Sequence, residues 1–145
     1  MAHPDLNELL NTLLPFAKQT LGEHGEFYPF GAWMCNDGRV VDVGAKDPET
    51  DYPRSQRLIE LLTEAFRQRA HAGEIRAAGA CFDVLIQPPK EQQKSDAIQL
   101  ALEHRDGEAA DVFLPYRRDE AGILHYGELF ACKRASQFFA PASGL

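Results

Sequence analysis

In two segments of this chain, apolar residues recur at every third or fourth position, which is the period of one helix face. The first segment runs from Asp5 to Leu21. Asp5 followed by Glu8 is typical of a capping box at a helix start. Pro15 is expected to kink or divide this helix near Leu14, and Gly22 to end it.

The second helical segment is Ser55–Ala72, where six apolar residues form one stripe and Gly73 follows as the stop signal. Other segments alternate between apolar and polar residues, which indicates strands. We predict strands at Ile75–Gln87, Asp96–His104 and Ile123–Tyr126. The last segment, Glu128–Phe139, fits either a final strand or a short helix.

Two Asp-Gly turns lie between alternating runs, and each predicts a β-hairpin. In the first hairpin, Glu26–Gly44, a three-residue loop at 36–38 pairs Trp33 with Val41. It also pairs Met34 with Val40, although a two-residue loop remains an alternative there. Gly38 then occupies the left-handed position that such a loop requires.

The second hairpin has a register that can be tested by its apolar match. A two-residue turn at 106–107 would place Leu102 opposite Asp111. A three-residue loop, 105–107, instead makes three apolar pairs: Leu102 with Ala110, Leu100 with Val112, and Ile98 with Leu114. Because a slip of one residue exchanges the two faces of a strand, we predict the longer loop.

Together these elements predict one α+β domain over residues 1–145: a single antiparallel sheet of about five strands with helices packed on it. The order is helix, hairpin, helix, three-strand meander and a C-terminal element. It resembles the order in roadblock-like and profilin-like domains, which implies a helix at the C-terminal end. A shared topology carries no function with it.

Four short motifs resemble the pattern of a family of small bacterial proteins of unknown function. They are Asp96-Ala97-Ile98, Leu102-Glu103-His104 with Asp106-Gly107, Leu114-Pro115-Tyr116, and Tyr126-Gly127-Glu128-Leu129-Phe130-Ala131. The resemblance spans mainly residues 96–131. It implies a bacterial source but supplies no catalytic or binding residues.

The net charge of −7 from 15 basic and 22 acidic residues disfavours nucleic acid as a partner. No apolar run is long enough for a membrane span, and no secretory signal is visible, so we expect a cytoplasmic protein without membrane contact. Three widely spaced cysteines, Cys35, Cys81 and Cys132, fit buried free thiols in a reducing compartment.

Motifs for catalysis, nucleotides or metals are missing from the sequence. There is no phosphate-binding loop and no nucleophile elbow. The five histidines are isolated and no Cys or His pair has ligand spacing, so we expect no cofactor and no metal. His104 and His125 are expected to be able to approach each other in the folded meander, although surface positions are the plainer interpretation.

One face of the predicted meander combines small residues with carboxylates. Alternation places Ala77, Gly79, Cys81 and Asp83 on it together with Gln99, Ala101, Glu103, Ala109, Asp111 and Phe113. This face is either exposed, a partner contact or an acid/base site. The candidate partner-binding residues are Asp83, Gln99, Glu103, Asp111 and Phe113; no catalytic residue is assigned.

A second candidate contact is the aromatic group around the start of the first strand, which contains Phe27, Tyr28, Phe30 and Trp33. Pro29 favours an edge position for this strand, and edge strands with aromatic residues serve as docking sites. The alternative is that these aromatic side chains pack beneath the first helix.

Three functions therefore stand as hypotheses. The preferred one is a non-enzymatic protein-interaction module, including self-association, that uses its sheet face or its first-strand edge. The first alternative is an acidic inhibitor of the immunity type that masks a basic toxin or nuclease, since negative charge accelerates association with a cationic target. The second is a small-molecule enzyme that uses Asp83, Glu103, His104 or Asp111.

Overall fold

The computed structural model describes residues 3–139 and contains two helices and seven strands in one antiparallel sheet. The fold class is therefore the predicted α+β one, with more strands than expected. The elements are α1 (Pro4–His24), β1 (Phe30–Cys35), β2 (Val40–Gly44), α2 (Ser55–His71), β3 (Ile75–Ile86), β4 (Ser95–His104), β5 (Ala109–Arg118), β6 (Leu124–Tyr126) and β7 (Phe130–Lys133). Within this part of the chain, neither helix has the length and apolar character needed to cross a membrane.

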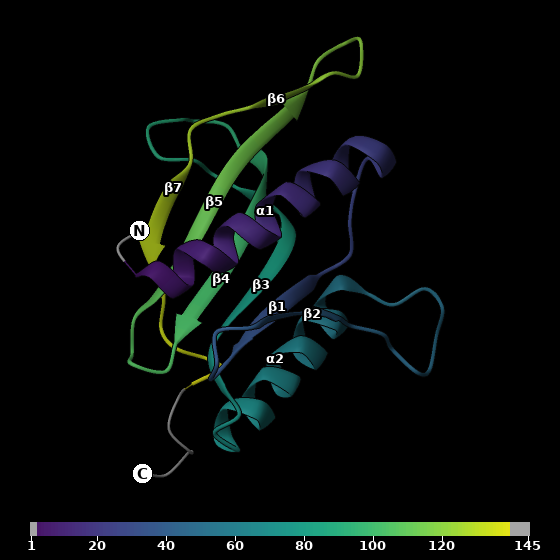
Figure 1. Ribbon diagram of the computed structural model, residues 1–145. Helices are drawn as coiled ribbons and strands as arrows, with labels where there is room; N and C mark the ends of the chain where they lie inside the picture. The colour runs from purple at the N-terminus through teal and green to yellow at the C-terminus, as the bar shows by residue number, and fades with distance from the viewer. Residues whose placement is uncertain (1–2, 140–145) are drawn as a thin grey trace.

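The sheet order is β2-β1-β3-β4-β5-β6, and β7 pairs with the first half of β5 (Figure 1). β3, β4 and β5 form the predicted meander. β1 lies between β2 and β3, so the expectation that the first strand is an edge is wrong. The open edge on this side of the sheet belongs to β2 instead.

Both predicted hairpin registers are confirmed. Trp33 pairs with Val41 in the first hairpin, and Leu100 pairs with Val112 in the second. Gly38 and Gly107 both have positive φ angles, +91° and +104°, as three-residue loops of this kind require. The apolar match between paired residues was sufficient to select the register of the second hairpin, and the structure selects the three-residue loop for the first.

The ends of α1 differ from the prediction. His3 is the N-cap residue, because its Nδ1 accepts the Asp5 N–H at 3.1 Å. The helix continues through Pro15 and Gly22 and ends at the left-handed Gly25 (φ +80°). Tertiary packing explains this continuity, since buried leucines on both sides of Pro15 hold the whole helix on the sheet.

The two helices cover opposite faces of the sheet (Figure 1). α1 packs on the face that carries Ile98, Leu100 and Leu102, which are fully buried. α2 packs on the other face against Ala78 and Ala80. The small side chains therefore leave room for a helix to pack closely against the sheet. A Cβ at Gly79 would lie only 2.9 Å from side-chain atoms of Leu13 and Leu102.

The C-terminal segment begins as strand β7 and then crosses the α2 face of the sheet without forming a helix within the described residues. Phe138 is buried there, with its ring edge-on to Phe66 at 4.9 Å between centroids. The strand alternative is thus correct for 130–133, and residues 134–139 do not form the final helix that the topological resemblance implied.

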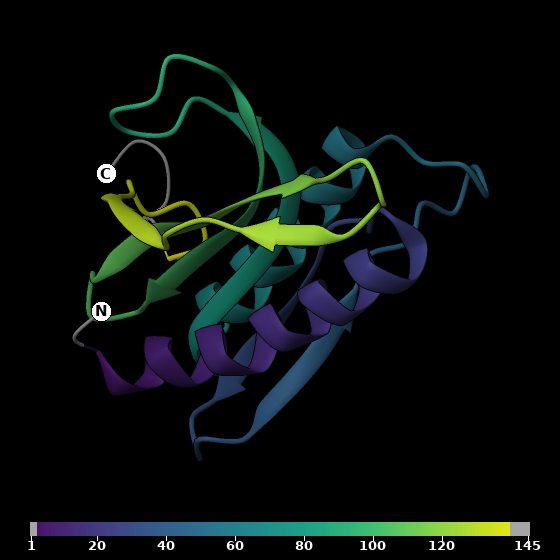
Figure 2. The ribbon, with the colours of Figure 1, turned by 90° about the horizontal axis from the view of Figure 1, so that it is seen from above.

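Two connections project from this framework. Residues 45–54 extend away from the sheet between β2 and α2, and residues 87–94 project on the side away from α1 (Figure 2). Among the cysteines, only Cys81 is buried, while Cys35 is partly exposed and Cys132 is exposed. Burial and the neighbouring Asp83 carboxylate raise the pKa of the Cys81 thiol, which makes it a poor nucleophile.

Candidate partner-binding surface

The predicted small and acidic face is not a single surface. Asp83 pairs with Ile98 on the α1 face, whereas Glu103 pairs with Ala78 on the α2 face. The prediction that Asp83 shares a face with Gln99, Glu103, Asp111 and Phe113 is therefore wrong. Since a helix covers each face, apolar residues occur on both sides of β3, and alternation within that strand did not show which side faces which helix.

The carboxylates on the α2 face are paired within the chain. Glu103 is fully buried and accepts a 2.7 Å hydrogen bond from Arg134 Nε. It also accepts backbone N–H groups of Gln137 and Phe138 at 2.9 and 2.8 Å. Arg134 Nη1 contacts Asp111 at 3.1 Å, so one guanidinium joins both carboxylates. These contacts hold the C-terminal segment on the sheet.

The other two residues of that face also have internal partners. Gln99 donates to Asp111 at 3.0 Å, and Phe113 stacks on Phe130 of β7 with 5.2 Å between ring centroids. Partner binding by these residues stays a prediction, but their polar groups and rings already have a structural role.

Asp83 lies in a different environment, on the wall of a cavity of about 440 Å³ at the C-terminal end of α1. The cavity is lined by Thr20, His24, Glu26, Phe27, Tyr28, Ser55 and Asp83. Phe27 is buried under α1, as the sequence suggested for the aromatic group, while Tyr28 is 57% exposed. Trp33 departs from that expectation, because it packs edge-on against Phe66 of α2 on the other face. The cavity thus combines an apolar floor with two carboxylates at its wall.

The Asp83 carboxylate has no ion-pair partner among residues 3–139; Tyr116 donates its hydroxyl to Asp83 Oδ1 at 2.5 Å. Burial raises the pKa of Asp83, the Tyr116 hydrogen bond lowers it, the charges of Asp96 and Glu26 raise it further, and the charge of Arg118 lowers it. The nearby cation, Arg118, donates its hydrogen bonds to the backbone carbonyls of Leu21 and Gly122. A carboxylate of raised pKa in a concavity is a functional-site candidate.

A second cavity, of about 320 Å³, lies further along the same side of α1. Thr12 and Phe16 of α1 line it, together with Phe30 of β1 and Asp42 and Gly44 of β2. Phe16 is 56% exposed although its ring packs edge-on against Phe30, 5.0 Å between centroids. Thr12, Phe16, Thr20 and His24 are four residues apart, so one stripe of α1 borders both cavities.

The edge of β2 adjoins the second cavity. Cys35 N–H bonds to the Arg39 carbonyl at 2.8 Å, which sets the alternation of hydrogen-bonded pairs in this hairpin. Val41 and Val43 therefore direct their backbone groups to β1. The N–H and C=O groups of Val40, Asp42 and Gly44 point away from it, where the sheet has no further strand.

We call this surface the α1–β2 groove; it consists of the outer edge of β2 and the two cavities beside α1. The sequence prediction missed it because the groove depends on which strand flanks β1. The sequence features that belong to the groove are the apolar run Val40-Val41 and the aromatic cluster at 27–30. His104 and His125 do not meet, since they lie at opposite ends of β5.

No family model, curated protein or solved structure matches this chain.

Proposed function

We propose that this protein is a protein-interaction module that binds an extended, basic segment of a partner in the α1–β2 groove. The observation that carries the proposal is the outward-facing row of backbone groups on β2 beside a cavity that the exposed ring of Phe16 lines. A segment that adds to a sheet edge gains main-chain hydrogen bonds, while pockets beside the edge select its side chains.

Charge supports a basic partner. Asp42 lines the cavity beside β2, and Glu26 and Asp83 line the cavity at the end of α1. The whole chain carries a net charge of −7. Lysine or arginine side chains would place positive charge beside these carboxylates, and Asp83 has no ion pair within residues 3–139 that they would displace.

The test uses a displayed library of random peptides, with selected sequences measured by fluorescence anisotropy. We expect selected peptides to combine basic and apolar residues, and their affinity to fall as sodium chloride is added. Gly44→Pro removes an outward N–H without breaking a bond to β1, so it should abolish binding. Gly44→Ala keeps the N–H, and its Cβ meets nothing within 4 Å, so it should bind normally.

Peptides that bind Gly44→Pro and the parent protein equally would overturn the groove proposal. A second copy of the chain is the other possible occupant of this edge, and sedimentation equilibrium of the parent and of Gly44→Pro tests it directly. The acidic-inhibitor alternative requires a folded cationic protein as the partner. It therefore predicts that no selected peptide depends on the β2 edge for its binding.

A further inference from the structure

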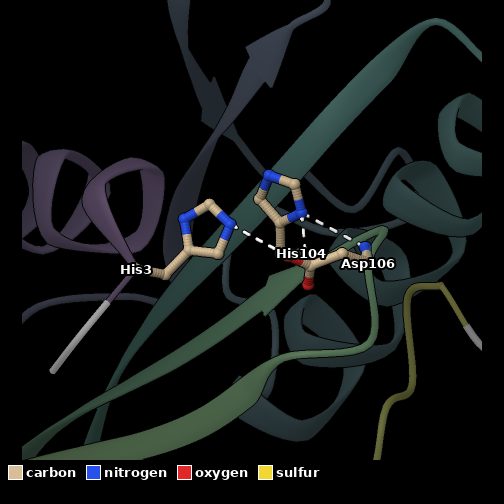
Figure 3. A group of neighbouring side chains, drawn as sticks. All are labelled: His3, His104 and Asp106. Carbon is tan, nitrogen blue, oxygen red and sulfur yellow. Dashed lines mark hydrogen bonds and ion pairs between the residues drawn. The ribbon is translucent and has the colours of Figure 1, made fainter.

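Three side chains with metal-ligand chemistry meet where the start of α1 crosses the β4–β5 turn. They are His3, His104 and Asp106 (Figure 3). One nitrogen or oxygen ligand atom of each lies within 4.8 Å of the other two. His3 Nε2 is 3.0 Å from Asp106 Oδ2, and His104 Nδ1 is 3.4 Å from Asp106 Oδ1. The two imidazole rings are stacked, with 4.0 Å between centroids.

The cluster has an outer set of contacts that orients one of its histidines. His104 Nε2 is 2.9 Å from Asp5 Oδ2. Asp5 is itself held by Arg76, whose Nε lies 3.2 Å from the same carboxylate. A histidine whose Nε2–H donates to a carboxylate presents an unprotonated Nδ1, and this arrangement is the usual support of a metal-ligating imidazole. His104 is only 10% exposed in its side chain, so its orientation is fixed by packing as well.

We propose that His3 Nε2, His104 Nδ1 and the Asp106 carboxylate bind a divalent transition-metal cation of the Zn²⁺ class. Two imidazoles and one carboxylate suit Zn²⁺, Co²⁺ or Ni²⁺ better than Ca²⁺ or Mg²⁺, which prefer oxygen ligands alone. Three protein ligands leave further coordination positions for water. Nitrogen ligands outnumber the single carboxylate in this group.

Metal binding rearranges a small number of hydrogen bonds. His3 Nδ1 accepts the Asp5 N–H at 3.1 Å, which leaves its proton on Nε2. When Nε2 takes the metal, the proton moves to Nδ1 and this helix-capping bond is lost. His104 Nδ1 likewise loses the 3.2 Å hydrogen bond that it accepts from the Asp106 N–H, and it binds the metal instead. Each lost bond costs about 1 kcal/mol, which is small beside the coordination energy of a transition metal.

The proposed site would tie the first turn of α1 to the turn between two central strands. It lies at the opposite end of α1 from the Asp83 cavity, roughly 30 Å away along a 21-residue helix. None of the three proposed ligands lines either cavity of the groove, so either proposal can fail without the other.

The test is a Co²⁺ titration of the full chain without an affinity tag, followed by Zn²⁺ calorimetry. We expect one ion per chain, with visible Co²⁺ absorption bands and a higher melting temperature in Zn²⁺. His3→Gln and Asp106→Asn should each lower the affinity at least tenfold. These two positions are partly or largely exposed, so the variants should fold even if His104 variants do not.

The matched control is His125→Gln, which removes another His–Asp pair, 2.8 Å from Asp119, where the described residues offer no third ligand. It should leave affinity and stoichiometry unchanged. Asp5→Asn should weaken binding through His104 while all three ligands remain. No saturation at millimolar Zn²⁺, or equal affinity in His3→Gln, Asp106→Asn and the parent, would overturn the proposal.

Discussion

Two carboxylates of the central sheet, Glu103 and Asp83, show opposite ways of placing a negative charge in this protein. Glu103 is fully buried and receives a guanidinium and backbone N–H groups from the C-terminal segment. Asp83 is partly buried, accepts one phenolic hydroxyl and faces a cavity. The hydrogen-bonding capacity of Glu103 is filled by groups of its own chain. Asp83 has no ion-pair partner among residues 3–139 and so keeps capacity for a cation from a partner.

The comparison also separates stability from binding. A charge whose hydrogen-bonding capacity is filled by its own chain holds the fold together, and its loss is costly. A charge kept in a cavity without a counter-ion is a cost to folding that a bound partner can offset. We therefore expect substitutions at the two sites to act in opposite directions.

The largest effect is expected for Glu103→Ala. Removing this carboxylate leaves Arg134 and the backbone N–H groups of 137 and 138 without their partner. We expect a loss of about 3 to 5 kcal/mol in the free energy of unfolding, measured by urea denaturation. Glu108→Ala, an exposed glutamate beyond the same strand, is the control and should change stability by less than about 0.5 kcal/mol.

An intermediate effect is expected for Tyr116→Phe, which removes the hydrogen bond to Asp83 and keeps the ring in the core. We expect the free energy of unfolding to fall by about 1 kcal/mol at neutral pH. Tyr126→Phe serves as control, because its ring packs 6.5 Å from that of Tyr116 on the neighbouring strand. Equal losses in both variants would contradict the role given to the Asp83 hydrogen bond.

The smallest effect on stability, and one of opposite sign, is expected for Asp83→Asn. The amide oxygen still accepts the Tyr116 hydroxyl, and no charge remains to be desolvated. We expect a gain of about 0.5 kcal/mol at neutral pH after solvent screening, together with weaker binding of basic peptides. A loss of stability with unchanged peptide affinity would contradict the distinction between the two carboxylates.

The pH dependence of this variant sharpens the test. The folded-state pKa of Asp83 is raised above that of the unfolded chain, so the folded state binds the proton more tightly. The contribution of Asp83 to the stability of the parent protein should therefore fall as pH rises from the usual aspartate pKa through the raised one. Denaturation curves of Asp83→Asn should lack this decline, and the difference between the proteins should be constant at higher pH.

The sequence was sufficient for the elements that depend on local contacts. The three-residue loops at 36–38 and 105–107 and the registers they impose follow from neighbouring residues, as does the stripe of α2. The faces of β3 did not follow, because residues 87–94 are a long connection that fixes no register. Apolar residues on both sides of β3 reflect two helices, and periodicity alone cannot say which helix lies on which side.

The candidate sites were hidden for the same reason. Glu103 is buried because Arg134 and the segment after it return from 31 residues away. His3, His104 and Asp106 meet across an interval of about a hundred residues, so no ligand spacing marks them in the chain. The open edge of β2 follows from the position of β1 between β2 and β3, which the sequence does not show. Each of these features depends on contacts between distant segments.

The pairing of Glu103 with residues 134–138 has a consequence for how the protein is made. These residues follow both helices and all seven described strands along the chain, so a ribosome adds them after every other described element. Until these residues are added, the buried carboxylate of Glu103 has no counter-ion. The nascent domain therefore cannot complete its packing around this side chain. Chains that stop before Arg134 should therefore be targets for quality-control proteases.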